Sequence, residues 1–290
     1  MIISVNGQFI EEGKAVISAY DHGFLYGLGL FETFRTYAGS PFMLNEHLSR
    51  MEESLSELWI DYRPDADHIR RLVKRLLAEN GLADGYFRLS VSAGEEALGL
   101  PAGRYSKPAE ILYVKALPPA DETLYDRGKP LQLLETTRNT PEGAIRGKSF
   151  HYMNNVLAKR EMSRYPWAAG CEGLFLTAGG HVAEGIVSNV FFIRGSVCFT
   201  PSIETGILPG IARGCVIKLA KQCGLRVEEG LYTQERLLDA EECFITNSIQ
   251  EIVPITSVFD REGGKRIIGS GSAGPATRLL LREYRSLCGK

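Results

Sequence analysis

Lys148 stands in a context in which its side chain could react with an aldehyde. The residues that follow it, 149–164, predict a helix on which Phe150, Met153 and Leu157 would form an apolar stripe. An ammonium group just ahead of a helix meets the positive end of the helix dipole, which favours the neutral amine. Only a neutral amine can attack an aldehyde carbon and form an imine. The pattern therefore indicates a lysine for covalent catalysis, with an ordinary surface lysine as the alternative.

A carboxylate, Glu184, ends one of the strands predicted for the second half of the chain. It precedes Gly185 and lies just ahead of a strongly apolar strand. A carboxylate buried at such a place requires a partner, and a protonated heteroaromatic nitrogen would serve. The alternative is an ordinary glutamate at the edge of a sheet.

An anion site is predicted where residues 206–210, a Gly/Pro turn, lead into a helix. The free backbone N–H groups of Ile211 and Ala212 would point out of the helix start, with the helix dipole behind them. Asn247 and Ser248, at the end of an apolar strand, could add an amide and a hydroxyl to the same anion. These groups indicate a phosphate site; a plain helix start and a plain turn are the alternatives.

The elements that would position these groups begin with a region of short strands and two helices. The predicted strands are residues 2–5, 31–37, 86–92 and 111–114, and the predicted helices are residues 45–58 and 67–80. The second helix is followed by Gly81, a residue that commonly ends helices. This pattern predicts a small α+β domain.

The second region carries a strand meander and further helices. Its predicted strands are residues 132–135, the meander 173–201 and 243–246, and its predicted helices are residues 149–164, 211–223 and 275–288. A stretch rich in proline and acidic residues, 118–122, separates the two regions. We therefore predict an α/β protein of two domains: an N-terminal α+β domain (1–117), a linker (118–130) and a larger mixed α/β domain (131–290).

Composition narrows the possible partners. Net charge is −2 with both signs interspersed, so no basic face for nucleic acid is expected. No apolar run approaches the roughly 18 residues that span a bilayer, and the first residues lack the features of a secretory signal. The six cysteines and five histidines show no metal-ligand spacing. We expect a cytoplasmic protein that binds a small molecule and no metal, membrane or nucleic acid.

One motif is interpreted as a coincidence. Residues 269–274 satisfy G-x-G-x-x-G, which in dinucleotide-binding proteins opens a helix and cradles phosphates. That function would also need a surrounding βαβ unit and an acidic residue about 20 positions further on. We interpret the glycines as a turn into the last helix, with Pro275 at its start.

Several motifs in order along the chain resemble those of the fold-type IV enzymes that use pyridoxal 5′-phosphate (PLP). The matching segments are Asn45-Glu46-His47-Leu48-Ser49-Arg50, Lys148-Ser149 with Asn154-Asn155-Val156, Glu184-Gly185 with Ser188-Asn189-Val190-Phe191, and Thr246-Asn247-Ser248 with Glu251 and Pro254. The resemblance covers nearly the whole chain. Members of this family are branched-chain and D-amino-acid aminotransferases and aminodeoxychorismate lyases. The resemblance implies PLP as the cofactor and a homodimer with residues of both subunits near it.

The resemblance also implies roles for individual residues. Lys148 would carry the cofactor as an imine and move protons, and Glu184 would hold the pyridine nitrogen. Arg50 would bind the cofactor phosphate together with the anion site predicted above. Leu208 would pack against the face of the ring.

Within the family, three segments are most similar to the aminodeoxychorismate lyases of the Bacillus type: residues 21–27, 138–143 and 152–155. The Arg-x-His pair typical of D-amino-acid aminotransferases is absent from residues 88–100. The sequence after Lys148 also lacks the Gly-Asn-Tyr of the branched-chain enzymes. The resemblance implies a lyase that converts 4-amino-4-deoxychorismate to 4-aminobenzoate and pyruvate.

Phe31 and Arg88 are candidates for contact with the substrate, and packing within a strand is the alternative for both. Two other functions stay open. One is a class IV aminotransferase that uses the same lysine and glutamate on branched-chain or D-amino acids. The other is a protein of this fold without catalytic activity.

Overall fold

The structure is a computed structural model that describes residues 1–119 and 121–289. It divides into two compact units. Unit 1 comprises Met1–Pro119 and Gly147–His151, and unit 2 comprises Ala120–Arg146 and Tyr152–Lys290. The segment that carries Lys148 therefore belongs to unit 1. The domain limits drawn from the sequence stay a prediction.

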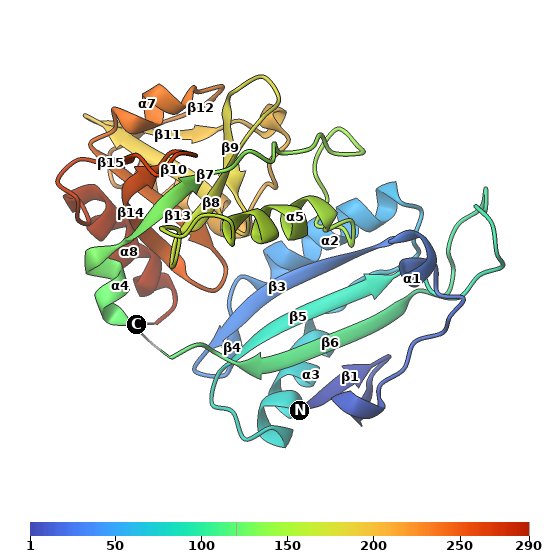
Figure 1. Ribbon diagram of the computed structural model, residues 1–290. Helices are drawn as coiled ribbons and strands as arrows, with labels where there is room; N and C mark the ends of the chain where they lie inside the picture. The colour runs from blue at the N-terminus through green and yellow to red at the C-terminus, as the bar shows by residue number, and fades with distance from the viewer. Residues whose placement is uncertain (120, 290) are drawn as a thin grey trace. The chain divides into compact units, whose positions relative to one another are not determined.

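Unit 1 is built on a six-stranded sheet with strand order β2-β1-β6-β5-β3-β4 (Figure 1). Its strands are β1 (Ile2–Val5), β2 (Gln8–Glu11), β3 (Gly29–Tyr37), β4 (Ser40–Pro41), β5 (Gly85–Ser92) and β6 (Ala109–Ala116), and its helices are α1 (His22–Tyr26), α2 (Leu44–Glu57) and α3 (Ala66–Glu79). Neighbouring strands of the sheet pair antiparallel. The four strands and two helices predicted for this region are confirmed, with ends shifted by at most two residues.

The two faces of this sheet differ because successive side chains of a strand point to opposite sides. Phe87, Leu89 and Val91 of β5 are fully buried in a core that includes the apolar residues of α2 and α3. The alternate residues of β5, Arg88 and Ser90, point to the other face. One face of the sheet therefore packs in the hydrophobic core of unit 1, and the other face carries polar and aromatic side chains.

Unit 2 contains a nine-stranded sheet with the order β12-β11-β10-β13-β14-β7-β8-β9, in which β15 pairs with β14. Its strands are β7 (Lys129–Leu133), β8 (Glu172–Leu176), β9 (Val182–Gly185), β10 (Asn189–Arg194), β11 (Val197–Pro201), β12 (Arg226–Gly230), β13 (Glu242–Asn247), β14 (Glu251–Phe259) and β15 (Lys265–Ile267). Most pairs are antiparallel, but β7 runs parallel to both β8 and β14, and β11 runs parallel to β12. The predicted meander of residues 173–201 is confirmed as β8 to β11, whereas β14 was not predicted.

The helices of unit 2 are α4 (Glu122–Arg127), α5 (Met153–Met162), α6 (Ile211–Gln222), α7 (Gln234–Leu238) and α8 (Pro275–Leu287). The predictions for α6 and α8 are confirmed, and Pro275 is the first residue of α8. Part of the expected linker is helical, since it contains α4. No helix in the described parts of the chain is both long and apolar enough to span a bilayer.

The prediction for residues 149–164 was wrong in two respects. The helix begins only at Met153, because Lys148, Ser149 and Phe150 pair with β3 in unit 1 instead. The expected apolar stripe is not buried either: Met153 is 68% exposed and Leu157 is 47% exposed. Lys148 is therefore not at a helix start, and the argument from the helix dipole does not apply, since that effect is confined to the first turn.

Candidate functional site

Lys148 lies beside β3 in unit 1. The backbone N–H of Phe31 donates to the Lys148 carbonyl at 2.8 Å, and the N–H of Phe150 donates to the Gly29 carbonyl at 3.0 Å. These two bonds hold the segment around Lys148 extended along the strand. The Lys148 Nζ lies 4.6 Å from the centroid of the Phe31 ring. The predicted lysine and a predicted substrate residue are therefore neighbours.

Arg88 reaches the same aromatic ring from β5. Its guanidinium carbon lies 3.5 Å from the Phe31 ring centroid, and its Nε donates to Ser90 Oγ at 3.1 Å. A cation is attracted to the electron-rich face of an aromatic ring. The structure thus brings together three of the predicted site residues within unit 1.

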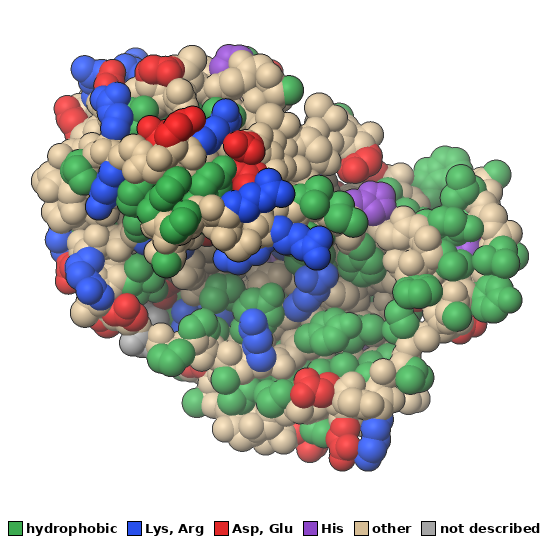
Figure 2. All heavy atoms as spheres, in the orientation of Figure 1, with side chains coloured by type: hydrophobic (Ala, Val, Ile, Leu, Met, Phe, Trp, Pro, Cys, Tyr) green, Lys and Arg blue, Asp and Glu red, His purple; other side chains and the backbone are tan. Residues whose placement is uncertain are grey.

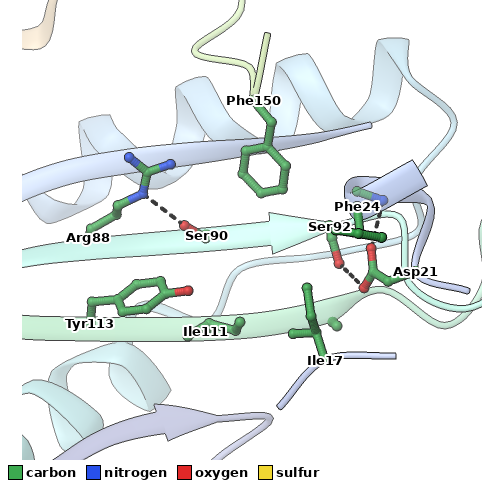
Figure 3. Close-up of a pocket in the computed structure, with 11 residues that line it drawn as sticks. Ile17, Asp21, Phe24, Arg88, Ser90, Ser92, Ile111, Tyr113 and Phe150 are labelled. Atoms are coloured by element: carbon green, nitrogen blue, oxygen red, sulfur yellow. Dashed lines mark hydrogen bonds between the residues drawn. The ribbon is translucent and has the colours of Figure 1, made fainter. Parts of the chain in front are cut away.

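A cavity of about 390 Å³ lies on this polar face of the unit 1 sheet (Figure 3). It is lined by Ile17, Asp21, Gly23, Phe24, Arg88, Ser90, Ser92, Ala109, Ile111, Tyr113 and Phe150. Asp21 closes one end, where its carboxylate accepts from Ser92 Oγ at 2.7 Å and from the Gly23 N–H at 2.6 Å. Apolar walls with one arginine and several hydroxyls suit a small, partly apolar anion.

Arg50, the predicted phosphate ligand, lies on α2 and pairs with Glu32 of β3. Its Nε and Nη2 donate to the two Glu32 oxygens at 2.8 and 2.6 Å, and His47 Nδ1 lies 2.6 Å from the same carboxylate. Glu32 is buried, which by itself would raise its pKa, but Arg50 and His47 lower that pKa to about 2. No role for Glu32 was predicted from the sequence, although it lies one residue after Phe31. The pair fixes the guanidinium of Arg50 against the sheet.

Glu184 of β9 is buried in unit 2 and accepts three hydrogen bonds. Arg138 Nε donates to its Oε1 at 2.8 Å. The Leu208 N–H and Asn189 Nδ2 donate to its Oε2 at 3.0 and 3.2 Å. Burial raises the pKa of the Glu184 carboxyl, and Arg138 opposes that rise without cancelling it. The carboxylate form would therefore gain from one more cationic neighbour.

Arg138 is a site residue that the sequence analysis did not identify. It lies in a segment that was quoted only for its family likeness, and it is 7% exposed. Its contact with Glu184 depends on folding, because 45 residues separate the two in the sequence. The sequence offered one general sign that such a residue must exist: a carboxylate predicted to be buried requires a partner.

The start of α6 follows shortly after Leu208, the residue whose backbone N–H donates to Glu184. Leu208, which bonds Glu184 through its N–H, is separated from Ile211 only by Pro209 and Gly210. Gly210 caps the helix without any side-chain hydrogen bond. Its lack of a side chain is required, because a Cβ there would lie 2.1 Å from Asn189 Oδ1. The helix start of the predicted anion site and the predicted ring-nitrogen partner thus belong to one connected part of unit 2.

Asn247 and Ser248 form a turn between β13 and β14. The Asn247 Oδ1 accepts from the N–H groups of Ile249 and Gln250 at 2.9 and 2.8 Å. The side-chain oxygen of Asn247 therefore stabilises the turn. Its amide nitrogen lies 3.4 Å from Gln250 Oε1, too long for a strong hydrogen bond.

Comparison with known proteins adds the decisive observation. The profile of the amino-transferase class IV family matches residues 29–258. The chain belongs to the class IV aminotransferase family. It is an enzyme of this class, and its mixed α/β fold agrees with the fold expected from the sequence.

Relatives of this class IV chain include both lyases and aminotransferases. It is 44% identical over 284 residues to the aminodeoxychorismate lyase of Bacillus subtilis, covering 97% of this chain and 94% of the relative. The structure of 4-amino-4-deoxychorismate lyase from Pseudomonas aeruginosa matches with a TM-score of 0.84 and 27% identity, over 98% of both chains. The branched-chain aminotransferase of Escherichia coli matches with a TM-score of 0.85 and 26% identity, over 99% of this chain and 94% of that one.

Proposed function

We propose that this class IV enzyme is a PLP-dependent lyase that converts 4-amino-4-deoxychorismate to 4-aminobenzoate and pyruvate. The observation that carries the proposal is the 44% identity, over 97% of the chain, to a protein named as aminodeoxychorismate lyase. That identity exceeds the 36% shared with a putative branched-chain aminotransferase of Methanocaldococcus jannaschii. The structural similarity to the solved lyase from Pseudomonas aeruginosa also supports the proposal.

The donor groups of the chain suit PLP. A branched-chain aminotransferase of similar structure has been solved as a complex with N-(5′-phosphopyridoxyl)-L-glutamate, which supports the cofactor. A carboxylate has about four acceptor positions. Glu184 uses three of them, on Arg138, Leu208 and Asn189, which leaves one for a ring N–H. When bound, PLP supplies an electron sink for the charge that develops at the substrate carbon.

Each binding residue would then meet a different part of the cofactor. We propose that Lys148 binds the aldehyde carbon through its amine and that Glu184 accepts from the ring nitrogen. The phosphate would rest on Arg50 and on the anion site made by the N–H groups of Ile211 and Ala212 with Asn247 and Ser248. Leu208 would cover one face of the ring.

The reaction requires one proton to be removed from the ring carbon that bears the amino group. A second proton must be added to the expelled enolpyruvyl carbon, and the two products together contain the atoms of the substrate. We propose that the substrate amino group would replace the Lys148 amine on the aldehyde carbon, and that the freed amine would then take the first proton. Loss of the enolpyruvyl group leaves an aromatic ring, which makes the reaction effectively irreversible.

The substrate carries two carboxylates, and Arg88 is the proposed partner of one of them. Arg88 lines the cavity of unit 1 together with Ser90 and Tyr113, and it contacts the same Phe31 ring as Lys148. Phe31 is only 3% exposed, so it would act on the substrate mainly by holding the Arg88 and Lys148 side chains against its ring.

The proposal is tested by incubating the purified protein with 4-amino-4-deoxychorismate and following 4-aminobenzoate and pyruvate together. Equal amounts of both products are expected. Lys148→Ala should lower turnover by at least about a thousandfold, because both the cofactor link and the proton carrier are lost. Full activity of that variant, or the absence of 4-aminobenzoate with the unaltered protein, would contradict the assignment.

An aminotransferase is the second candidate, because aminotransferases of this family are also similar in structure and sequence. It would use the same Lys148 and Glu184 but return the amino group to a keto acid. Incubation with branched-chain or D-amino acids and 2-oxoglutarate separates the two functions, since only the aminotransferase forms glutamate rapidly.

We further propose that the enzyme is a cytosolic homodimer. Apolar side chains reach the surface at several places on the face shown in Figure 2. Helix α5 exposes Met153, Val156 and Leu157 at helical spacing, which suits a partner helix or sheet. The six cysteines are free thiols, in keeping with a reducing compartment.

A further inference from the structure

We propose that Arg138 is the positioning residue that keeps Glu184 ionised, and thereby keeps the proton on the ring nitrogen of the bound cofactor. This inference rests on the proposed function, because it requires PLP to be bound with its nitrogen at Glu184. It gives a role to Arg138 and to Asn154 and Asn155, for which the resemblance implied none.

The contact between the two residues is direct and shielded from water. Arg138 Nε and Glu184 Oε1 are 2.8 Å apart, and both side chains are about 5% exposed. An ion pair in such a place interacts more strongly than one on the surface, because little solvent screens it. The guanidinium thus stabilises the charged form of Glu184 from the side of Oε1, while Oε2 accepts from Leu208 and Asn189.

The Arg138 side chain is itself held by the paired asparagines of α5. Its Nη1 donates to Asn154 Oδ1 at 2.7 Å and lies 3.4 Å from Asn155 Oδ1. Asn155 is fixed in turn, because its Nδ2 donates to the Ile186 carbonyl at 2.6 Å. A third amide, Asn139 Oδ1, lies 3.1 Å from the same Nη1. These neutral acceptors orient the guanidinium without neutralising its charge, so that Glu184 is its one anionic contact among the described residues.

Few other charges act on Glu184. Arg146, which donates to the carbonyls of Gly206 and Asn139, is the second cation and also favours ionised Glu184. Glu142 acts on Arg146 in turn. Burial opposes both arginines and raises the pKa of Glu184. Arg138 donates a hydrogen bond to the Glu184 carboxylate. Its removal should therefore reduce the ionisation of Glu184 more than removal of Arg146 would.

Arg138 would influence the position of one proton that Glu184 and the ring nitrogen share. Glu184 and the ring nitrogen together would hold one proton, either as carboxylate with N–H⁺ or as carboxylic acid with neutral nitrogen. Arg138 contacts the carboxylate directly, so it would favour the charged pair. Without that positive charge, burial would move the proton to Glu184, and the ring would withdraw electrons less strongly.

A purely structural role predicts something else. Arg138 also joins β9 to α5, so its loss could loosen both elements. Loosening would weaken PLP binding whatever the charge of the replacement. It would not make the ring-nitrogen protonation depend on whether residue 138 is charged.

The test compares Arg138→Gln, which removes the charge but keeps a donor, with Arg138→Lys, which keeps the charge. Arg164→Gln is the matched control, because Arg164 is an exposed arginine just after α5. Each protein is loaded with PLP labelled with ¹⁵N in the ring, and the ¹⁵N chemical shift reports whether the nitrogen carries a proton. PLP affinity and kcat are measured on the same samples.

We expect the unaltered protein, Arg138→Lys and Arg164→Gln to give the protonated ¹⁵N shift. Arg138→Gln should move toward the neutral value, and its kcat should fall at least about tenfold while Arg138→Lys recovers most of it. An unchanged ¹⁵N shift in Arg138→Gln, or an equal change in Arg138→Lys, overturns the inference while leaving the proposed function standing. Failure of the unaltered protein to bind PLP would overturn the proposed function instead.

A second variant keeps the test valid if neither Arg138 variant folds. Asn154 is only half-buried, and Asn154→Asp would put a carboxylate against Arg138 Nη1. That anion would compete with Glu184 for the guanidinium charge. We expect a smaller ¹⁵N move in the same direction, and an unchanged ¹⁵N shift would again overturn the inference.

Discussion

Glu32 and Glu184 are both buried carboxylates, but their surroundings shift their pKa values in opposite directions. Glu32 has two basic neighbours, Arg50 and His47, and its pKa falls to about 2. Glu184 has one arginine in contact, and burial keeps its pKa raised. The first carboxylate is therefore satisfied by the chain itself, whereas the second gains from a cationic ligand. This difference supports a structural task for Glu32 and a binding task for Glu184.

The low pKa of Glu32 predicts a pH-dependent contribution to stability. The ordinary value is 4.5 and the folded value is about 2, so ionised Glu32 stabilises the fold above pH 4.5. This contribution is lost as the pH falls from 4.5 toward 2. Glu32→Gln should lower the free energy of unfolding by about 3 kcal/mol at pH 7, because it removes the buried carboxylate that Arg50 and His47 contact.

Urea unfolding at pH 7 and at pH 3 measures this effect. The difference in free energy of unfolding between the unaltered protein and Glu32→Gln should be smaller at pH 3 than at pH 7. Glu57→Gln is the control, since Glu57 is an exposed carboxylate at the end of α2, the helix that carries Arg50. Equal gaps at the two pH values would show that Glu32 is not ionised as described.

At the scale of elements, the placement of Lys148 depends on a strand-like pairing rather than on a helix. Residues 147–151 follow β3, and Gly29 allows this approach because a Cβ there would lie 2.4 Å from the Phe150 ring and 2.7 Å from the Val91 carbonyl oxygen. Only the second of these two obstacles is backbone. A side chain at position 29 must therefore shift β3 against β5 and push aside the ring of Phe150, which lies two residues after Lys148.

Gly29→Ala should destabilise unit 1 by about 1–3 kcal/mol, as overpacking does, and lower lyase activity by about a hundredfold through displacement of Lys148. Thermal unfolding and the product assay measure the two effects. Gly13→Ala is the control, because a Cβ at Gly13 meets nothing within 4 Å. Unimpaired activity in Gly29→Ala would mean that the pairing beside β3 does not position the lysine.

At the scale of the whole molecule, the exposed side of α5 predicts self-association. Apolar side chains at positions 153, 156 and 157 would stay in water in a monomer, which costs free energy in proportion to their area. Leu157→Glu should convert the dimer to a monomer in light scattering. Leu231→Glu, at a residue of similar exposure outside α5, should leave the mass unchanged. A monomeric unaltered protein would contradict the proposed dimer.

The class of fold, most long elements and the family could be predicted from the amino-acid sequence alone. These follow from local periodicity and from motif order, both of which can be read along the chain. Alternation of apolar residues predicted β3, β5 and β6, and helical spacing predicted α2, α3, α6 and α8. The short, irregular elements escaped because few residues define them, and β14 contains Pro254, which is unusual within a sheet.

Which groups neutralise the buried charges depends on how the elements pack in three dimensions. Arg138 meets Glu184 and Glu32 meets Arg50 across separate elements, and no local pattern encodes such pairs. The same holds for Lys148, whose helical surroundings were predicted from periodicity but whose segment bonds to β3 instead. Backbone groups that lack a partner within their own segment must find one elsewhere, and the fold alone supplies it.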